Sequence, residues 1–149
     1  MPYATSDDMV ERFDEAQLIK VASVVVDDED TLDTAKIERA IAGADAIIDL
    51  HVGGCYAVPL ALLSASATAL VLGFSCDIAR FKLYGDATNA PEAAKDAYDA
   101  AIAMLVAIRD GKAPLAATAA SASDPAATAD SVELASDAPF FTRDSLRNF

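Results

Sequence analysis

The stretch that decides the fold is SASATALVLGFSCDIARFKLY, residues 64–84. Apolar side chains recur there, and just before it, at a spacing near 3.5 residues: Leu63, Ala67, Leu70, Phe74, Ile78 and Phe81. This period is that of one face of an α-helix. Further apolar residues widen the face, namely Val71, Leu72 and Leu83, and Gly85 follows as a helix-ending residue. The pattern predicts a helix from Ser64 to Tyr84 that is the most buried in the molecule.

Two further helices are predicted, one on each side of this segment. The earlier one begins at Asp33 or Thr34, ends at Gly53–Gly54, and carries an apolar stripe at Ile37, Ile41, Ala44, Ile48 and Val52. The later one begins at Pro91, which suits a first turn, and carries its stripe at Ala94, Tyr98, Ala101, Leu105 and Ile108. We expect the stripes 37–52, 63–81 and 98–108 to pack together. The fold class is therefore all-α, a small helical bundle with long central helices.

Shorter elements precede these helices. Thr5 and Asp8 have a spacing similar to that of a capping box, which predicts a first helix from about Thr5. A second short helix is predicted over residues 14–21. The β-branched run at 24–26 predicts extended backbone, and the four acids at 27–30 predict a solvated loop.

Composition restricts the class of protein further. The 149 residues suffice for one domain, and 34 of them are alanine. The 24 acidic and 11 basic residues give a net charge of −13, and residues 1–50, with 13 acids and 4 bases, carry −9 of it. Phosphate contacts need clustered Lys and Arg, so this charge argues against a general nucleic-acid binder and against docking on an anionic membrane.

The chain contains one uncharged stretch, residues 50–76, that is long enough to span a bilayer. Gly53, Gly54 and Pro59 interrupt it, so we expect a buried helix there and no membrane contact. The start of the chain lacks the pattern of a signal peptide, and two cysteines do not make a disulfide framework. Synthesis in a reducing, intracellular compartment is expected.

The domain organisation follows from a change in composition after Gly111. We expect a helical domain over residues 1–112 and an extended tail over residues 113–149. In residues 113–138, 17 of the 26 are Ala, Ser or Thr, which offers little bulk for a core. The last ten residues regain aromatic and basic side chains, which predicts a tip that docks on another subunit or protein.

Candidate chemistry is sparse. His51 has no partner pattern around it, so a structural histidine at a helix end is expected, and its spacing to Cys55, with Cys76, matches no common zinc site. The acids of residues 27–38 follow the ligand positions of a calcium loop, but Leu32 stands where glycine is needed. Calcium binding stays open as the alternative to a solvated loop.

One charged pair stands in the most apolar predicted helix. Asp77 and Arg80 are three residues apart, which predicts a structural ion pair, either within one subunit or across a subunit boundary. Glycine-rich phosphate loops and nucleophile motifs are not found. We therefore expect a protein that is not an enzyme, with no catalytic, cofactor or metal site.

An ordered set of short segments carries a family resemblance. The segments are Tyr3-Ala4-Thr5, Arg12-Phe13, Ala44-Asp45 with Ile48-Asp49, Cys55 to Leu60, Cys76 to Phe81, and Phe141 to Leu146. In this order they resemble the Mu-like phage and prophage neck proteins, which are small head–tail adaptors. The resemblance covers almost the whole chain. It implies a helical bundle that forms a ring beneath the portal of a filled capsid, with an extended terminus that contacts neighbouring neck proteins.

The resemblance also implies partners and a location. The protein would be a structural component of the virion neck, made in the bacterial host cytoplasm. It would form a homo-oligomeric ring, expected to be a dodecamer, in contact with the portal protein and with downstream neck, stopper or tail proteins. DNA would pass through the ring without specific binding. The alternative is a soluble acidic helical binding or regulatory protein, such as an inhibitor that mimics nucleic acid.

Two groups of residues are expected to serve this role. The first group is expected to contact other subunits or partners: Tyr56, Pro59, Asp77, Arg80, Phe140, Phe141, Arg143, Asp144, Leu146 and Phe149. The second group comprises acids expected to face the lumen or its rim: Asp7, Asp8, Glu11, Asp27, Asp28, Glu29 and Asp30. An acidic wall repels phosphate, so DNA would slide past it without being held.

Overall fold

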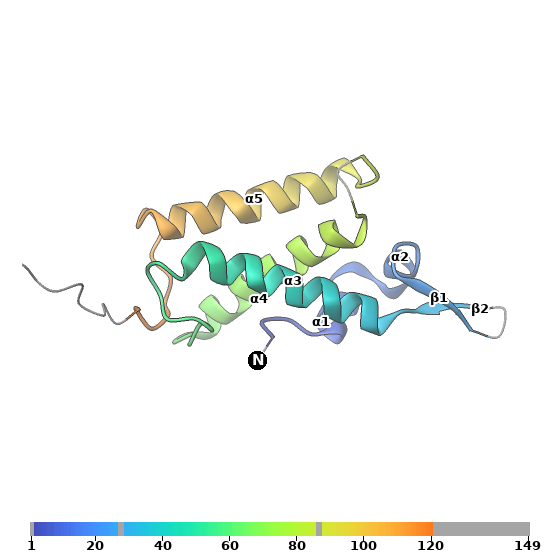
Figure 1. The fold of residues 1–149 in the computed structure, drawn as a ribbon, viewed down its shortest axis with the longest axis horizontal. Helices are drawn as coiled ribbons and strands as arrows, with labels where there is room; N and C mark the ends of the chain where they lie inside the picture. Colours follow the sequence, from blue (N-terminus) through green and yellow to red (C-terminus); the bar gives the residue numbers. More distant parts are fainter. Residues whose placement is uncertain (1, 27–28, 86–87, 121–149) are drawn as a thin grey trace, which may run out of the picture.

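The computed structural model describes residues 2–26, 29–85 and 88–120. In chain order the elements are α1 (Ser6–Phe13), α2 (Glu15–Ile19), β1 (Ser23–Val26), β2 (Glu29–Leu32), α3 (Thr34–Val52), α4 (Ala65–Leu83) and α5 (Glu92–Arg109). Figure 1 shows α3, α4 and α5 as a bundle, with α1 and α2 beside it and the two strands extending from one end. The predicted all-α class is confirmed. Helices of this part of the chain are too short or too polar to cross a membrane.

The core lies where the three long helices meet. Its largest fully buried side chains include Ile37 and Ile48 of α3, Val71 and Ile78 of α4, and Leu105 of α5. The predicted packing of these three helices on one another is therefore confirmed. Many of the remaining core positions are alanines, which let the helix backbones approach closely.

The inward face of α4 differs from the predicted stripe at its N-terminal half. Leu63 is 70% exposed and Leu70 is 42% exposed, so neither belongs to the core. The buried positions follow the spacing four, three, four, which is also helical but selects Val71 in place of Leu70: Ala67, Val71, Phe74 and Ile78. With Val71 pointing inward, Leu70 is turned about 100° away from the core. Assigning both leucines to the core was wrong.

Three helix starts carry side-chain caps, and those of α1 and α3 agree with the sequence prediction. Thr5 and Asp8 form a complete capping box at α1, in which each side chain binds the other residue's backbone N–H. Asp33 accepts from the Lys36 N–H at 2.9 Å and caps α3. Ser64 accepts from the Ala67 N–H at 3.1 Å and caps α4.

A β-hairpin replaces part of the predicted acidic loop. β1 and β2 pair antiparallel, with Val25 opposite Asp30 and Val26 opposite Glu29. The valine run needs a partner strand for its backbone groups, and residues 29–32 supply it. The expectation that Glu29 and Asp30 lie in a loop was wrong, whereas Asp27 and Asp28 lie outside the described residues.

The segment after α5 returns along the bundle to the connector between α3 and α4. The Ala57 N–H donates to the Thr118 carbonyl at 3.0 Å, and the Leu63 N–H donates to the Ala116 carbonyl at 2.8 Å. Leu115 and Ala117 are buried against the core. The packed structure thus extends past residue 112, where the tail was expected to begin, up to residue 120.

A strained backbone position joins α1 to α2, and it carries a testable consequence. Asp14 has φ 66° and ψ 134°, a conformation that favours glycine, and its side chain is exposed. We expect Asp14→Gly to raise the free energy of unfolding by about 1 kcal/mol, because relieved strain outweighs the added freedom of the unfolded chain. Asp14→Ala is the matched control and should bring no such gain. Equal urea midpoints for the two variants would contradict the assignment of strain.

Candidate functional site

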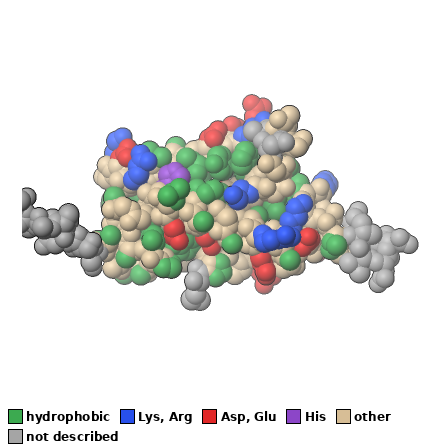
Figure 2. Space-filling model, in the orientation of Figure 1, with side chains coloured by type: hydrophobic (Ala, Val, Ile, Leu, Met, Phe, Trp, Pro, Cys, Tyr) green, Lys and Arg blue, Asp and Glu red, His purple; other side chains and the backbone are tan. Residues whose placement is uncertain are grey.

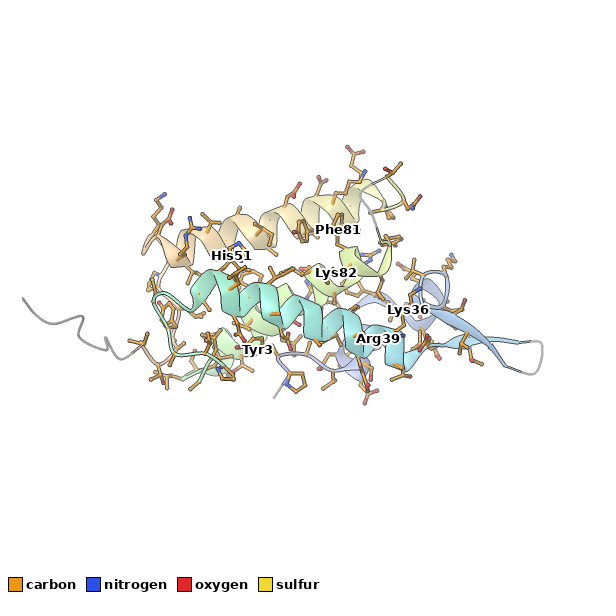
Figure 3. All side chains as sticks on the ribbon, viewed as in Figure 1. Tyr3, Lys36, Arg39, His51, Phe81 and Lys82 are labelled. Atoms are coloured by element: carbon orange, nitrogen blue, oxygen red, sulfur yellow. The ribbon has the colours of Figure 1, made fainter. Side chains whose placement is uncertain are left out.

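A network around Tyr3 ties the N-terminal segment to three other parts of the fold. The Tyr3 hydroxyl donates to Asp49 of α3 through a short hydrogen bond and accepts from the Leu60 N–H at 2.7 Å. The Tyr3 N–H donates to Asp45 Oδ2 at 3.0 Å, and Ser75 Oγ of α4 donates to Asp45 Oδ1 at 2.7 Å. We call these residues the Tyr3 network, and Figure 3 shows Tyr3 beside α3.

The electrostatics of the Tyr3 network follow from its partial burial. Burial, reinforced by the hydrogen bond to Asp49, raises the pKa of Tyr3 to about 12. Burial also raises the pKa of Asp45 above its usual range, although the hydrogen bonds from Ser75 and from the Tyr3 backbone oppose this shift. The N-terminal segment is thus held by a neutral phenol and a partly desolvated carboxylate.

An open groove of about 590 Å³ runs between the N-terminal segment and α3. Its floor is apolar and is formed by Ala4, Ile41, Ala42 and Ala46. Along its length stand three carboxylates of α3, those of Glu38, Asp45 and Asp49. Side-chain cations of the described residues do not come within ion-pair distance of these three. We call this feature the acidic groove, and Figure 2 shows acidic side chains among hydrophobic ones on this face.

A second cluster surrounds Phe13 at the end of α1. The Arg12 guanidinium makes bidentate hydrogen bonds to the Asp77 carboxylate, with Nη2 2.9 Å from Oδ2. The Arg80 guanidinium lies over the Phe13 ring, 4.5 Å from the ring centroid. Arg80 also donates to Gln17 at 3.4 Å. Within the subunit the predicted Asp77–Arg80 ion pair is wrong, because Arg12 reaches Asp77 from another helix with bidentate geometry. A pair between Asp77 and Arg80 of neighbouring subunits stays a prediction. Burial raises the pKa of Asp77, and Arg12 opposes that shift.

The two connector residues expected at an interface have different surroundings. The Tyr56 hydroxyl accepts from the Leu115 N–H at 2.9 Å, so this half-buried side chain holds the segment that follows α5. Pro59 is exposed, and its peptide bond with Val58 is cis. Six residues of the same group lie outside the described residues: Phe140, Phe141, Arg143, Asp144, Leu146 and Phe149. The described members of the group are spread over two regions and do not form one site.

The acids expected at a lumen are similarly dispersed. Asp7 and Glu11 are exposed on α1 at i and i+4, which places both on one side of that helix. Asp8 is half-buried and is engaged in the capping box. Glu29 and Asp30 lie in β2, away from α1 in Figure 1.

His51 occupies a structural position at the end of α3. His51 Nδ1 lies 2.8 Å from the Ile47 carbonyl in the last turn of α3, which confirms the expected helix-end histidine. Within residues 2–26, 29–85 and 88–120, the His, Cys, Asp and Glu side chains form no group of three that could hold a metal ion.

The two thiols should differ sharply in reactivity. Cys55 is exposed, whereas Cys76 is fully buried in α4 and burial raises its pKa to about 11. Native protein at pH 8 should therefore react with a disulfide reagent at one thiol per chain, and denaturant should reveal the second. Cys55→Ser should abolish the native reaction. Reaction of two thiols per native chain would contradict the burial of Cys76.

Sequence reasoning did not identify the Tyr3 network. Its members lie 30 to 57 residues apart in pairs, so no local pattern connects them. One signal was present, because Asp45 and Asp49 follow Ala44 and Ile48 directly. Carboxylates that flank an apolar stripe in this way lie beside a packed surface, where they need donors.

Comparison with known proteins places the chain in a family. A search of curated proteins finds no match to it. The family of bacteriophage Mu Gp36 matches residues 3–134, which is most of the 149-residue chain and includes the Tyr3 network and the cluster around Phe13. With a match of this extent, the protein belongs to the bacteriophage Mu Gp36 family.

Proposed function

We propose that this protein is a structural head–tail adaptor, which forms a ring in the neck of a tailed phage particle and lets DNA pass through it. The observation that carries the proposal is membership of the Mu Gp36 family over residues 3–134. The sequence resemblance to Mu-like neck proteins gives that membership its specific role. The portal protein and the downstream neck, stopper or tail proteins are the proposed partners.

The physical character of the fold supports an assembly role. A closed ring needs a heterologous contact, in which different surfaces of one subunit meet. The protein offers such unlike surfaces, since the acidic groove lies along α3 whereas the Phe13 cluster, with two arginines, lies at the end of α1. A role of this kind requires no reaction.

Purified phage particles provide the decisive test. Quantitative mass spectrometry should find this chain at a fixed number of copies per particle, comparable with the portal protein. Deleting the gene should leave DNA-filled heads without joined tails, and supplying the chain from a plasmid should restore them. Absence of the chain from purified particles would refute the proposal, and would favour the soluble acidic binding protein instead.

The charge of the protein leads to a further expected result. A net charge of −13 repels phosphate, and a ring wall that repels DNA would not slow its exit. We expect no measurable binding of duplex DNA at physiological salt. Electrophoretic mobility shift at several salt concentrations checks this, and a shift that weakens steeply with salt would contradict it.

A further inference from the structure

The acidic groove has the features of a peptide-binding site. Its volume of about 590 Å³ lies within the usual range for ligand sites, and its apolar floor carries a few polar groups at the edge. The Glu38 side chain is exposed and makes no hydrogen bond or ion pair within the described residues, and the Asp45 side chain lies partly buried without a side-chain cation. An occupant that supplies both apolar and cationic groups would complement this groove.

One segment of the chain has that composition. Residues 139–149, PFFTRDSLRNF, contain three phenylalanines, one leucine and two arginines against one aspartate. We call this segment the tip; it lies outside the described residues. Nineteen residues lie between Ala120 and Phe140, a length that reaches about 65 Å when extended and about 25 Å on average. The tip of one copy can therefore reach the surface of a neighbour.

We propose that the acidic groove binds the tip of a second copy of this chain. The arginines of the tip lie against the carboxylates of α3, and its phenylalanines lie on the apolar floor. The inference rests on the proposed function, because a closed ring needs a head-to-tail contact and an exchanged tip supplies one. Copies with a net charge of −13 repel one another, so contacts between opposite charges favour their association.

The second hollow of the described structure does not fit the tip. It is lined by Val10, Glu11, Arg12, Phe13, Asp14, Gln17 and Arg80, so two arginines already stand at its edge. These arginines are matched by the carboxylates of Glu11 and Asp14, so the hollow has no excess negative charge for the arginines of the tip, and the Phe13 ring is already covered by a guanidinium. Charge and apolar surface together favour the acidic groove.

Cysteine cross-linking in the full-length chain tests the inference. One chain carries Ala42→Cys on the floor of the groove, and a second carries Ser145→Cys, a nearly isosteric change in the tip. Both also carry Cys55→Ser, and Cys76 is buried. Mild oxidation of the mixture should give a disulfide-linked dimer of unlike copies. The matched control replaces Ala42→Cys with Ala100→Cys, an exposed alanine of α5 that should link at least tenfold less.

Charge reversal supplies the second readout. Glu38→Arg and Arg147→Glu should each lower the cross-linking rate roughly fivefold, as expected for loss of one exposed charge pair. The two changes together should restore the rate. Equal rates for all variants would show that charge does not guide the contact, and would overturn the inference.

The outcomes separate this inference from the proposed function. A chain with both cysteines that links only within itself, at any concentration, would show that the tip binds its own copy and would overturn the exchange. Absence of any link above the α5 control would overturn the groove as the site, even if the chain is present in phage particles. A strong link between copies of a chain that is absent from particles would instead refute the adaptor role alone.

Discussion

Ile78→Ala is expected to lower the free energy of unfolding by about 2–5 kcal/mol. Ile78 is 0% exposed and lies at the centre of the inward face of α4, where α3 and α5 both pack. Truncation removes apolar contacts and leaves a cavity that a bundle held on several sides cannot fill by collapsing. Urea unfolding followed by circular dichroism measures the change.

Leu70→Ala is the matched control on the same helix. Leu70 is 42% exposed, so its truncation should lower the free energy of unfolding by about 0.5 kcal/mol or less, which is well below the decrease expected for Ile78→Ala. The sequence periodicity alone would assign both residues to the core. Similar losses for the two variants would show that α4 is rotated from the orientation described here.

Tyr3→Phe is expected to cost about 1–3 kcal/mol of stability. The ring remains, but the Leu60 N–H loses its acceptor and the Asp49 carboxylate loses its donor. Unpaired polar groups in a half-buried site carry a desolvation penalty. Tyr98→Phe is the control, because the Tyr98 ring stacks on Phe81 and its hydroxyl makes no hydrogen bond within the described residues. That variant should change the unfolding midpoint little.

The same substitution should alter the response to alkali. The pKa of Tyr3 rises from 10.0 to about 12 in the folded protein, so the folded state holds this proton more tightly than the unfolded state. Its contribution to stability is complete below pH 10 and is lost as the pH rises toward 12. Tyr3→Phe should therefore flatten the fall in unfolding free energy over that interval. An unchanged slope would show that the phenol is not held as described.

How far the sequence predicts this structure depends on the distance over which each interaction acts. The helix caps at Thr5 and Asp33 involve residues three apart, and both were predicted from local chemistry, whereas the equally local cap at Ser64 was not named. The hairpin was missed because a run of four acids suggests a loop, whereas pairing with the valines decides the outcome. Asp77 was assigned to Arg80 because only near neighbours can be compared in a sequence, yet Arg12 lies 65 residues away from it.

The candidate site shows the same limit more strongly. The stripe of α3 predicts its buried side, but the acidic groove exists only because Tyr3 fastens the N-terminal segment across Asp45 and Asp49. Folding creates that surface from parts of the chain that are more than forty residues apart.

The hairpin extending from the bundle has a consequence for the free subunit before assembly. A two-stranded ribbon leaves both of its outer edges open to a strand from another molecule, which is a common route to aggregation. The sequence carries four consecutive acids at residues 27–30, and like charges on approaching ribbons oppose edge-to-edge pairing. Acidification neutralises these carboxylates and removes that protection, so dilute, unassembled protein keeps best in neutral buffer of low ionic strength.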